Sequence, residues 1–304
     1  DDEVTYTASM DGKIEMQNDR IVVLPVHEVS GNAELAEGNI DFRGDIVIHG
    51  NVESGVSIRA TGSITIDGVA EACMLEAGKD IILRGGMLGG NKASVKTKGA
   101  ITAKFFEFTN ILCEGDLQAD VLMDCSVICH GQIRLTGRKG SIIGGKVQAI
   151  RGLIATSLGN DAEKRTEIFV GAGIDVYSRL RVMEKKIETT REELTKIEEG
   201  LEKFEILSKE RGLSYTNDPR RTSLLRIKIK DSAMLASDEE EVRKLRILAE
   251  SSRGACVSVI QEIYPGVIIN MDELKLALKN MATGVEFYKL PDKIGTRPCS
   301  AGVE

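Results

Sequence analysis

The chain has 304 residues, a formal net charge of −7 and an aromatic content of 4%, with 31 glycines and no tryptophan. This negative charge gives no general attraction for nucleic acids or anionic lipids, and no apolar stretch approaches the roughly 20 residues that span a bilayer. Abundant glycine and scarce aromatics are typical of thin repeated coils rather than of one large globular core.

Residues 1–43 are expected to contribute strands, around a turn at Asp11 and Gly12, that lead into the repeats described next. The chain begins without methionine, so we expect it to be a segment of a longer protein. No signal peptide is recognisable, and six scattered cysteines form no disulfide framework. These features favour a reducing cytoplasm.

Between residues 44 and 176 the chain repeats one short phrase, a glycine followed by two large aliphatic residues that are separated by one position. Copies begin at 44, 62, 79, 99, 115, 131 and 152. Apolar residues at every second position are typical of a strand with one buried face, and 16 to 21 residues is too short for a strand–helix unit. The pattern predicts a mainly β fold, a parallel β-helix, and the unequal coil lengths favour a right-handed winding.

Aligning the copies places similar residues in three columns that are predicted to stack from coil to coil. The two aliphatic columns are expected to point into a shared interior, and the column of small residues is expected to let the wall turn tightly. The first column contains Ile46, Ile64, Ile81, Ile101, Leu117, Ile133 and Ile154. The second contains Ile48, Ile66, Leu83, Ala103, Ala119, Leu135 and Thr156. A column of small residues before the glycines contains Ala60, Ala77, Thr97, Cys113 and Cys129.

Residues 177–252 are expected to form an inserted antiparallel coiled-coil hairpin, because the period there changes to that of a helix. The first helix has a seam of Leu180, Met183, Ile187, Thr190, Leu194, Ile197, Leu201, Phe204 and Ser208. The residues from Tyr215 to Pro219 predict a turn and a new helix start. The second helix has candidate seam residues Leu224, Ile227, Met234, Val242, Leu245 and Leu248.

Residues 253–304 return to a strand-like pattern, as in the segment ACVSVIQEIYPGVIINM that begins at Ala255. We expect this C-terminal β segment to dock on the β-helix and to cap one end of it. An uncapped end would expose apolar side chains and unpaired strand edges.

Several segments together resemble the flagellar assembly protein A family. They are GNIDFRGDIVIHGNVESG at 38–55, ATGSITIDGVAEA at 60–72, GGMLGG at 85–90, KGSIIGG at 139–145 and IYPGV at 263–267, with the helical hairpin between the last two. The resemblance covers almost the whole chain. It implies a role in flagellar assembly and in placement at the cell pole and, from one branch of the family, a sugar-phosphotransferase phosphocarrier as partner.

Two motifs suggest nucleotide or metal binding, but each has a simpler interpretation. Residues 140–147, GSIIGGKV, fit a phosphate-binding loop except that Val147 stands where a Ser or Thr would hold magnesium, which favours a β-helix turn. Cys125, Cys129 and His130 lack a convincing fourth metal ligand, which favours reduced thiols in the core.

The acidic residues of the glycine phrases, Asp45, Asp67, Asp80 and Asp116, occur singly in each coil without the spacing of calcium-binding repeats. We interpret them as solvated turn residues. Accordingly, no catalytic, cofactor-binding or metal-binding residue is predicted in the chain.

The favoured hypothesis is a non-enzymatic cytoplasmic scaffold that contacts protein partners through the hairpin or the C-terminal segment. Tyr215, Arg220, Arg221 and Arg226 near the hairpin tip are the candidate partner-binding residues. Two alternatives stay open, namely a hexapeptide-type acyltransferase that uses His49 or His130, and a polymer-forming β-helix protein of the cytoskeleton. The sequence decides neither the identity of the partner nor the oligomeric state.

Overall fold

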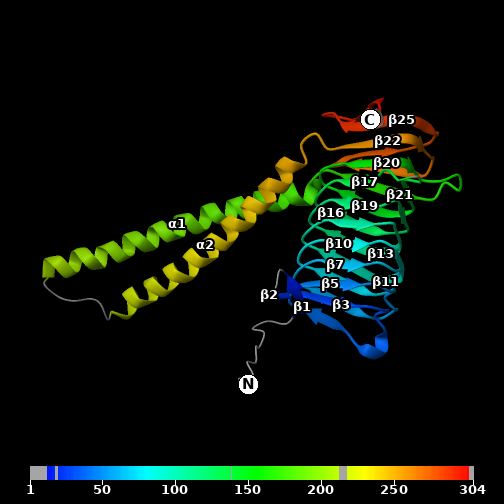
Figure 1. Cartoon of the computed structure of the whole chain (residues 1–304). Helices are drawn as coiled ribbons and strands as arrows, with labels where there is room; N and C mark the ends of the chain where they lie inside the picture. The colour runs from blue at the N-terminus through cyan, green and yellow to red at the C-terminus, as the bar shows by residue number, and fades with distance from the viewer. Residues whose placement is uncertain (1–11, 18–19, 138, 212–217, 301–304) are drawn as a thin grey trace, which may run out of the picture. The chain divides into compact units, whose positions relative to one another are not determined.

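The computed structural model describes residues 12–17, 20–137, 139–211 and 218–300. The chain divides into two compact units, of which one comprises Asp1–Gly173 with Ser252–Glu304 and the other comprises Ile174–Ser251. The first unit is a β-solenoid of about 8 turns, and the second consists of two helices (Figure 1). The predicted right-handed winding stays a prediction.

Strands of successive coils pair in parallel on three faces of the solenoid (Figure 1). On the first face lie β3 (Val26–Val29), β5 (Asp45–Ile48), β7 (Ile64–Ile66), β10 (Ile81–Leu83), β12 (Ile101–Ala103), β14 (Leu117–Gln118), β17 (Ile133–Leu135), β20 (Leu153–Leu158) and β22 (Cys256–Ile263). The parallel ladder thus begins at β3. This strand precedes residue 44, the position at which the repeat becomes recognisable in the sequence.

The third face carries the small-residue column, on β4 (Ile40–Phe42), β6 (Ser57–Ala60), β9 (Met74–Ala77), β11 (Met87–Thr97), β13 (Phe105–Cys113), β16 (Ser126–Cys129), β19 (Gly145–Ala149), β21 (Thr166–Val170) and β23 (Val267–Met271). Cys113 pairs with Thr97 on one side and with Cys129 on the other, as the alignment predicts. The second face is built from β8 (Ala70–Glu71), the first residues of β11 and β13, β15 (Val121–Met123), β18 (Ser141–Ile143) and the last residues of β20 and β22.

The predicted aliphatic ladder is confirmed through six coils. Ile81 pairs directly with Ile64 and with Ile101, and all three side chains are buried. The predicted positions Ile154 and Thr156 in the seventh copy are wrong, because Ile133 and Leu135 pair with Leu153 and Ala155. Gly152 has φ +117° and its carbonyl accepts the N–H of Ile133, so the glycine comes one residue later in this coil and shifts the inward positions by one.

The C-terminal segment adds a last coil and then changes direction. Strands β22 and β23 pair in parallel with β20 and β21. The next three strands are antiparallel, with β24 (Leu274–Ala277) on β23, β25 (Ala282–Lys289) on β22, and β26 (Ile294–Pro298) on β25. The strand edges of the last coil are therefore paired with antiparallel strands. Near the other end, β1 (Lys13–Gln17) and β2 (Arg20–Leu24) form a separate two-stranded antiparallel sheet, and a short 3₁₀ helix, η1, spans Leu35–Glu37.

Helices α1 (Gly173–Arg211) and α2 (Pro219–Ser251) run antiparallel. Ion pairs establish this direction, because Glu184 contacts Arg246, Arg191 contacts Glu239, and Glu198 contacts Lys228. Asp218 directly precedes α2, and its Oδ1 accepts the backbone N–H of Arg220 at 2.8 Å and thereby caps the helix. None of the helices in the described residues is long and apolar enough to cross a membrane.

The seam between the helices agrees with the predicted one on α1 but not throughout α2. Ile187, Leu194, Val242 and Leu245 are buried. The predictions for Ile227 and Met234 are wrong, because these side chains are 42% and 39% exposed. The less exposed positions of α2 keep a spacing of three and four residues, and charged side chains occupy several of them. They are Leu224, Lys228, Asp231, Leu235, Asp238, Val242 and Leu245.

Candidate functional site

The two histidines suggested for catalysis lie in different coils, since His49 follows β5 and His130 follows β16, where its backbone N–H donates to the carbonyl oxygen of Cys113. His27 packs its ring 5.6 Å from that of Phe42, while His49 lies on the outer surface between two carboxylates. His49 Nε2 is 2.9 Å from Glu28 Oε1, and Nδ1 is 2.8 Å from Asp67 Oδ2. These hydrogen bonds, first that with Glu28 and then that with Asp67, raise the pKa of His49. Both ring nitrogens are thus occupied, and neither is available to a substrate.

The cysteines near His130 are buried in the solenoid interior. Cys113 and Cys129 stack in register, and each Sγ faces the carbonyl oxygen of Gly115, at 3.3 and 3.2 Å. Burial raises the pKa of Cys125 to about 11, so this thiol is not a ready metal ligand. Among the described residues no three His, Cys, Asp or Glu side chains gather as a metal site would require.

The segment that fits a phosphate-binding loop consists of two strands, β18 and β19, which are separated by Gly144. The backbone N–H of Gly144 donates to Thr166 Oγ1 at 2.8 Å, and Lys146 Nζ lies 4.6 Å from the centre of the Phe169 ring. No helix follows whose N-terminus could bind a phosphate. The backbone N–H of Gly144 and the ammonium of Lys146, which would bind a phosphate in such a loop, therefore interact with other residues of the solenoid.

The acidic residues of the glycine phrases connect neighbouring coils. Oδ1 of Asp45, Asp80 and Asp116 accepts a backbone N–H of the next coil, from Ser63, Ala100 and Gln132, at 2.7, 2.7 and 2.8 Å. Asp67 differs, since it contacts His49 and Arg84. These carboxylates have a structural role that the interpretation as solvated turn residues did not include.

The candidate residues near the hairpin tip are only partly described. Tyr215 lies outside the described residues. Arg220 binds Asp218 with its guanidinium, which also lies 5.9 Å from the centre of the Phe204 ring. Arg221 is half-buried, and Arg226 is exposed. Among the three described arginines, Arg226 is the one whose side chain is exposed without a hydrogen bond or ion pair inside the described part of the chain.

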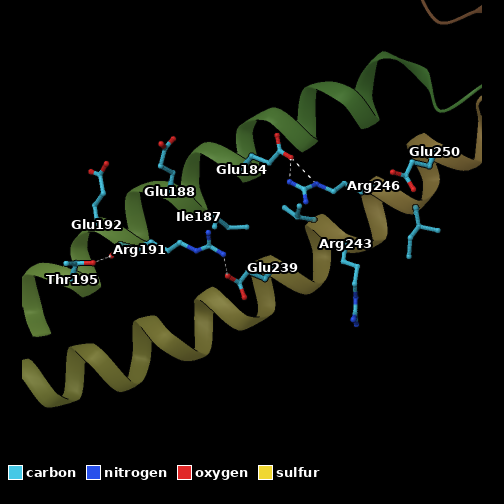
Figure 2. A pocket seen from close by; sticks show the side chains of 12 residues that line it. Glu184, Ile187, Glu188, Arg191, Glu192, Thr195, Glu239, Arg243, Arg246 and Glu250 are labelled. Carbon is cyan, nitrogen blue, oxygen red and sulfur yellow. Dashed lines mark hydrogen bonds and ion pairs between the residues drawn. The ribbon is translucent and has the colours of Figure 1, made fainter.

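A hollow with a volume of about 1070 Å³ lies on one side of the hairpin, between α1 and α2 (Figure 2). We call it the hairpin groove. Its floor includes Ile187 and Val242, which belong to the buried seam, and its α2 side includes Ile247, which is 59% exposed. Two ion pairs cross it, Glu184 with Arg246 and Arg191 with Glu239.

The groove is acidic. Five glutamates and three arginines line it, and all three arginines pair with glutamates, Arg243 with Glu240 outside the groove. Glu188 and Glu192 point away from α2 along the outer side of α1 (Figure 2). Within the described residues these two glutamates and Glu250 form no hydrogen bond or ion pair. The sequence interpretation missed this site, although glutamates beside a helical seam on one flank are a signal that could have suggested it.

A smaller hollow of about 400 Å³ lies on the second face of the solenoid. Phe105, Val121 and Met123 give it an apolar lining, with Lys104, Lys139, Glu107 and Asp120 also around it. Phe105 and Val121 are partners in adjacent coils. Because the two lysines balance the two acids, this hollow has no charge preference that would identify a partner.

A comparison with protein families gives one match. The model of the Flagellar Assembly Protein A beta solenoid domain matches residues 25–294 of the chain. No curated protein and no solved structure matches the chain.

Proposed function

Because the chain belongs to the Flagellar Assembly Protein A family, we propose that it is a protein-binding scaffold that serves flagellar assembly. In this proposal the solenoid is the rigid body, and the helical hairpin makes the partner contact. The hairpin groove is the observation that supports it most, because it combines exposed apolar surface with carboxylates that have no partner within the described residues.

The solenoid itself offers little to a reaction. Its interior is filled by aliphatic side chains such as Ile64, Ile81 and Ile101, each at most 1% exposed. His49 is held by two carboxylates, and the loop-like segment at 140–147 is strand. No observation favours the acyltransferase or the polymer-forming alternative over a scaffold.

Two finer parts of the proposal come from the resemblance of the sequence to the family. They are a place at the cell pole and a sugar-phosphotransferase phosphocarrier as the partner. Isothermal titration of the chain with a phosphocarrier, in its phosphorylated and its unphosphorylated form, tests the second part. We expect one form to bind more tightly than the other, and no heat with either form would remove the phosphocarrier from the proposal.

The scaffold function is tested by complementation in a flagellated bacterium that lacks its own copy of the protein. We compare the full chain with a variant in which residues 177–252 are replaced by a short flexible linker. The full chain is expected to restore swimming and the variant is not, provided that circular dichroism shows the β-solenoid intact. Equal restoration by both would contradict a role of the hairpin in partner binding.

A further inference from the structure

The dimensions of the hairpin groove suit one kind of occupant. On α1 it extends from Glu184 to Thr195, and on α2 from Glu239 to Glu250. At 1.5 Å per residue each side is about 16 Å long, or three helical turns. A groove between two antiparallel helices is filled efficiently by a third helix, whose side chains interdigitate with those of the pair.

The groove contains one apolar side chain, Ile247, that the hairpin itself does not cover. Ile187 and Val242 in the floor are 8% and 5% exposed, while Ile247 on its α2 side is 59% exposed. Ile247 contributes nothing to the seam between α1 and α2, and it stands next to residues that do. An apolar stripe on a third helix would cover Ile247 together with the floor.

The charges of the groove indicate that its occupant should be positively charged. Because Glu184 and Glu239 are neutralised by Arg246 and Arg191, the uncompensated charge comes from Glu188, Glu192 and Glu250. They flank the apolar surface on both helices. Carboxylates in this position attract a partner that carries lysine or arginine beside its apolar stripe.

The opposite flank of the hairpin has a different charge. There Arg179 contacts Glu241 and Lys186 contacts Asp238. By helical spacing from the seam, Lys196 and Lys203 continue this flank along α1, as do Lys230 and Lys244 along α2. Glu193 lies on this flank too, but the four lysines outnumber it, so a basic partner is attracted more strongly to the groove side of the hairpin.

We propose that the hairpin groove binds a basic amphipathic α-helix, three to four turns long, from a partner protein. Its apolar stripe covers Ile187, Val242 and Ile247, and its cationic side chains face Glu188, Glu192 and Glu250. This inference rests on the proposed function and deepens it by stating the chemistry of the partner.

The test uses the full chain and a fluorescein-labelled synthetic peptide of 14 residues, composed of leucine and lysine in amphipathic helical order. A peptide of the same composition in scrambled order is the control for charge alone. Fluorescence anisotropy is measured at low and at high salt. We expect the amphipathic peptide to bind more tightly than the scrambled one, and its affinity to fall as salt rises.

Two pairs of variants locate the site. Glu192→Lys is compared with Glu193→Lys, the same charge reversal on the opposite flank, and Ile247→Ser is compared with Met234→Ser. We expect Glu192→Lys and Ile247→Ser each to weaken peptide binding by about tenfold, and the two controls to change it by less than about twofold.

Three results would overturn the proposal. They are equal binding of the two peptides, equal loss with Glu192→Lys and Glu193→Lys, and sedimentation showing a dimer of the chain that Glu192→Lys dissociates. The last would identify a second copy as the occupant, through the basic start of α2 with its exposed Ile229. If the peptide fails to bind while the linker variant still fails in complementation, the inference is wrong and the scaffold function stands.

Discussion

At the scale of single residues, Asp and Asn side chains connect the coils where the strands end. Asp45 accepts the N–H of Ser63 in the next coil at 2.7 Å, and Asn51 accepts that of Val69 at 2.8 Å. Each carboxylate or amide satisfies a backbone donor at a turn, where the ladder of strand hydrogen bonds is interrupted. Asn serves in the same way as Asp, so the hydrogen bond rather than the charge is what these positions require.

The contacts of His49 lead us to predict that the stability of the protein depends on pH. Because its pKa is raised by Glu28 and Asp67, the stabilisation is fully present below the ordinary imidazole value of 6.5 and is lost as the pH rises through the higher folded value. Lys13 and Arg84 bind the same two carboxylates, and the hydrogen bonds from Lys13 and then from His49 lower the pKa of Glu28. His49→Gln should therefore lower the urea midpoint more at pH 5.5 than at pH 9.

The control for this prediction is His130→Gln, since His130 has no carboxylate partner in the described part of the chain. We expect this substitution to change the urea midpoint equally at both pH values. A loss from His49→Gln that is the same at pH 5.5 and pH 9 would show that the two carboxylates do not stabilise the protonated imidazole.

At the scale of the elements, the turns between strands decide how closely the coils stack. A side chain at Gly62, Gly99 or Gly131 would place its Cβ only 2.0 to 2.3 Å from the Oδ1 atom of the aspartate in the coil before. The same aspartates bind the backbone just after these glycines. Glycine and aspartate thus form one contact between coils, which explains why they recur together in the sequence.

Substitution of one such glycine tests this contact. In Gly131→Ala the new Cβ would meet Asp116 Oδ1 at 2.3 Å and the carbonyl oxygen of Gly115 at 2.4 Å. We expect this overpacking to lower the free energy of unfolding by about 1–3 kcal/mol. Gly31→Ala is the matched control, because its Cβ meets nothing within 4 Å, and it should change the free energy by less than about 0.5 kcal/mol. Equal effects in urea titrations would contradict the steric explanation.

At the scale of the whole molecule, the solenoid is a stack of coils in which each coil contacts its neighbours. Such a stack can extend wherever a coil presents an unpaired strand edge. After the last coil the chain folds β24, β25 and β26 antiparallel onto β23 and β22, and Phe287 of β25 packs into the interior. The C-terminal segment therefore pairs the edges that a further coil would use.

Removal of residues 279–304 should expose the edge of β22 and the apolar contacts of Phe287. We expect the shortened chain to associate, so that its molar mass in static light scattering rises with concentration while that of the full chain does not. Circular dichroism of the same samples checks that the solenoid strands persist. A shortened chain whose molar mass is independent of concentration would show that β25 and β26 do not prevent association.

The sequence by itself determined the parallel β-helix, its inward ladder from Ile46 to Ile133 and the presence of two helices. This was possible because coils that stack in register repeat their buried positions at a regular local spacing. Within one element the pattern also determined the seam of α1, where the apolar residues keep one period throughout. On α2 the apolar residues near its start depart from that period, and Ile227 and Met234 are exposed.

Only the tertiary structure decided the features that depend on contacts between distant parts of the chain. The shift at Gly152 appears only when Ile133 pairs with Leu153. The hairpin groove brings together residues far apart in the chain, such as Glu184 and Arg246, which are 62 residues apart. A local pattern can state which residues are apolar or charged, but it cannot state which of them face one another across two helices, because that register is set by packing and ion pairs over the full length of the hairpin.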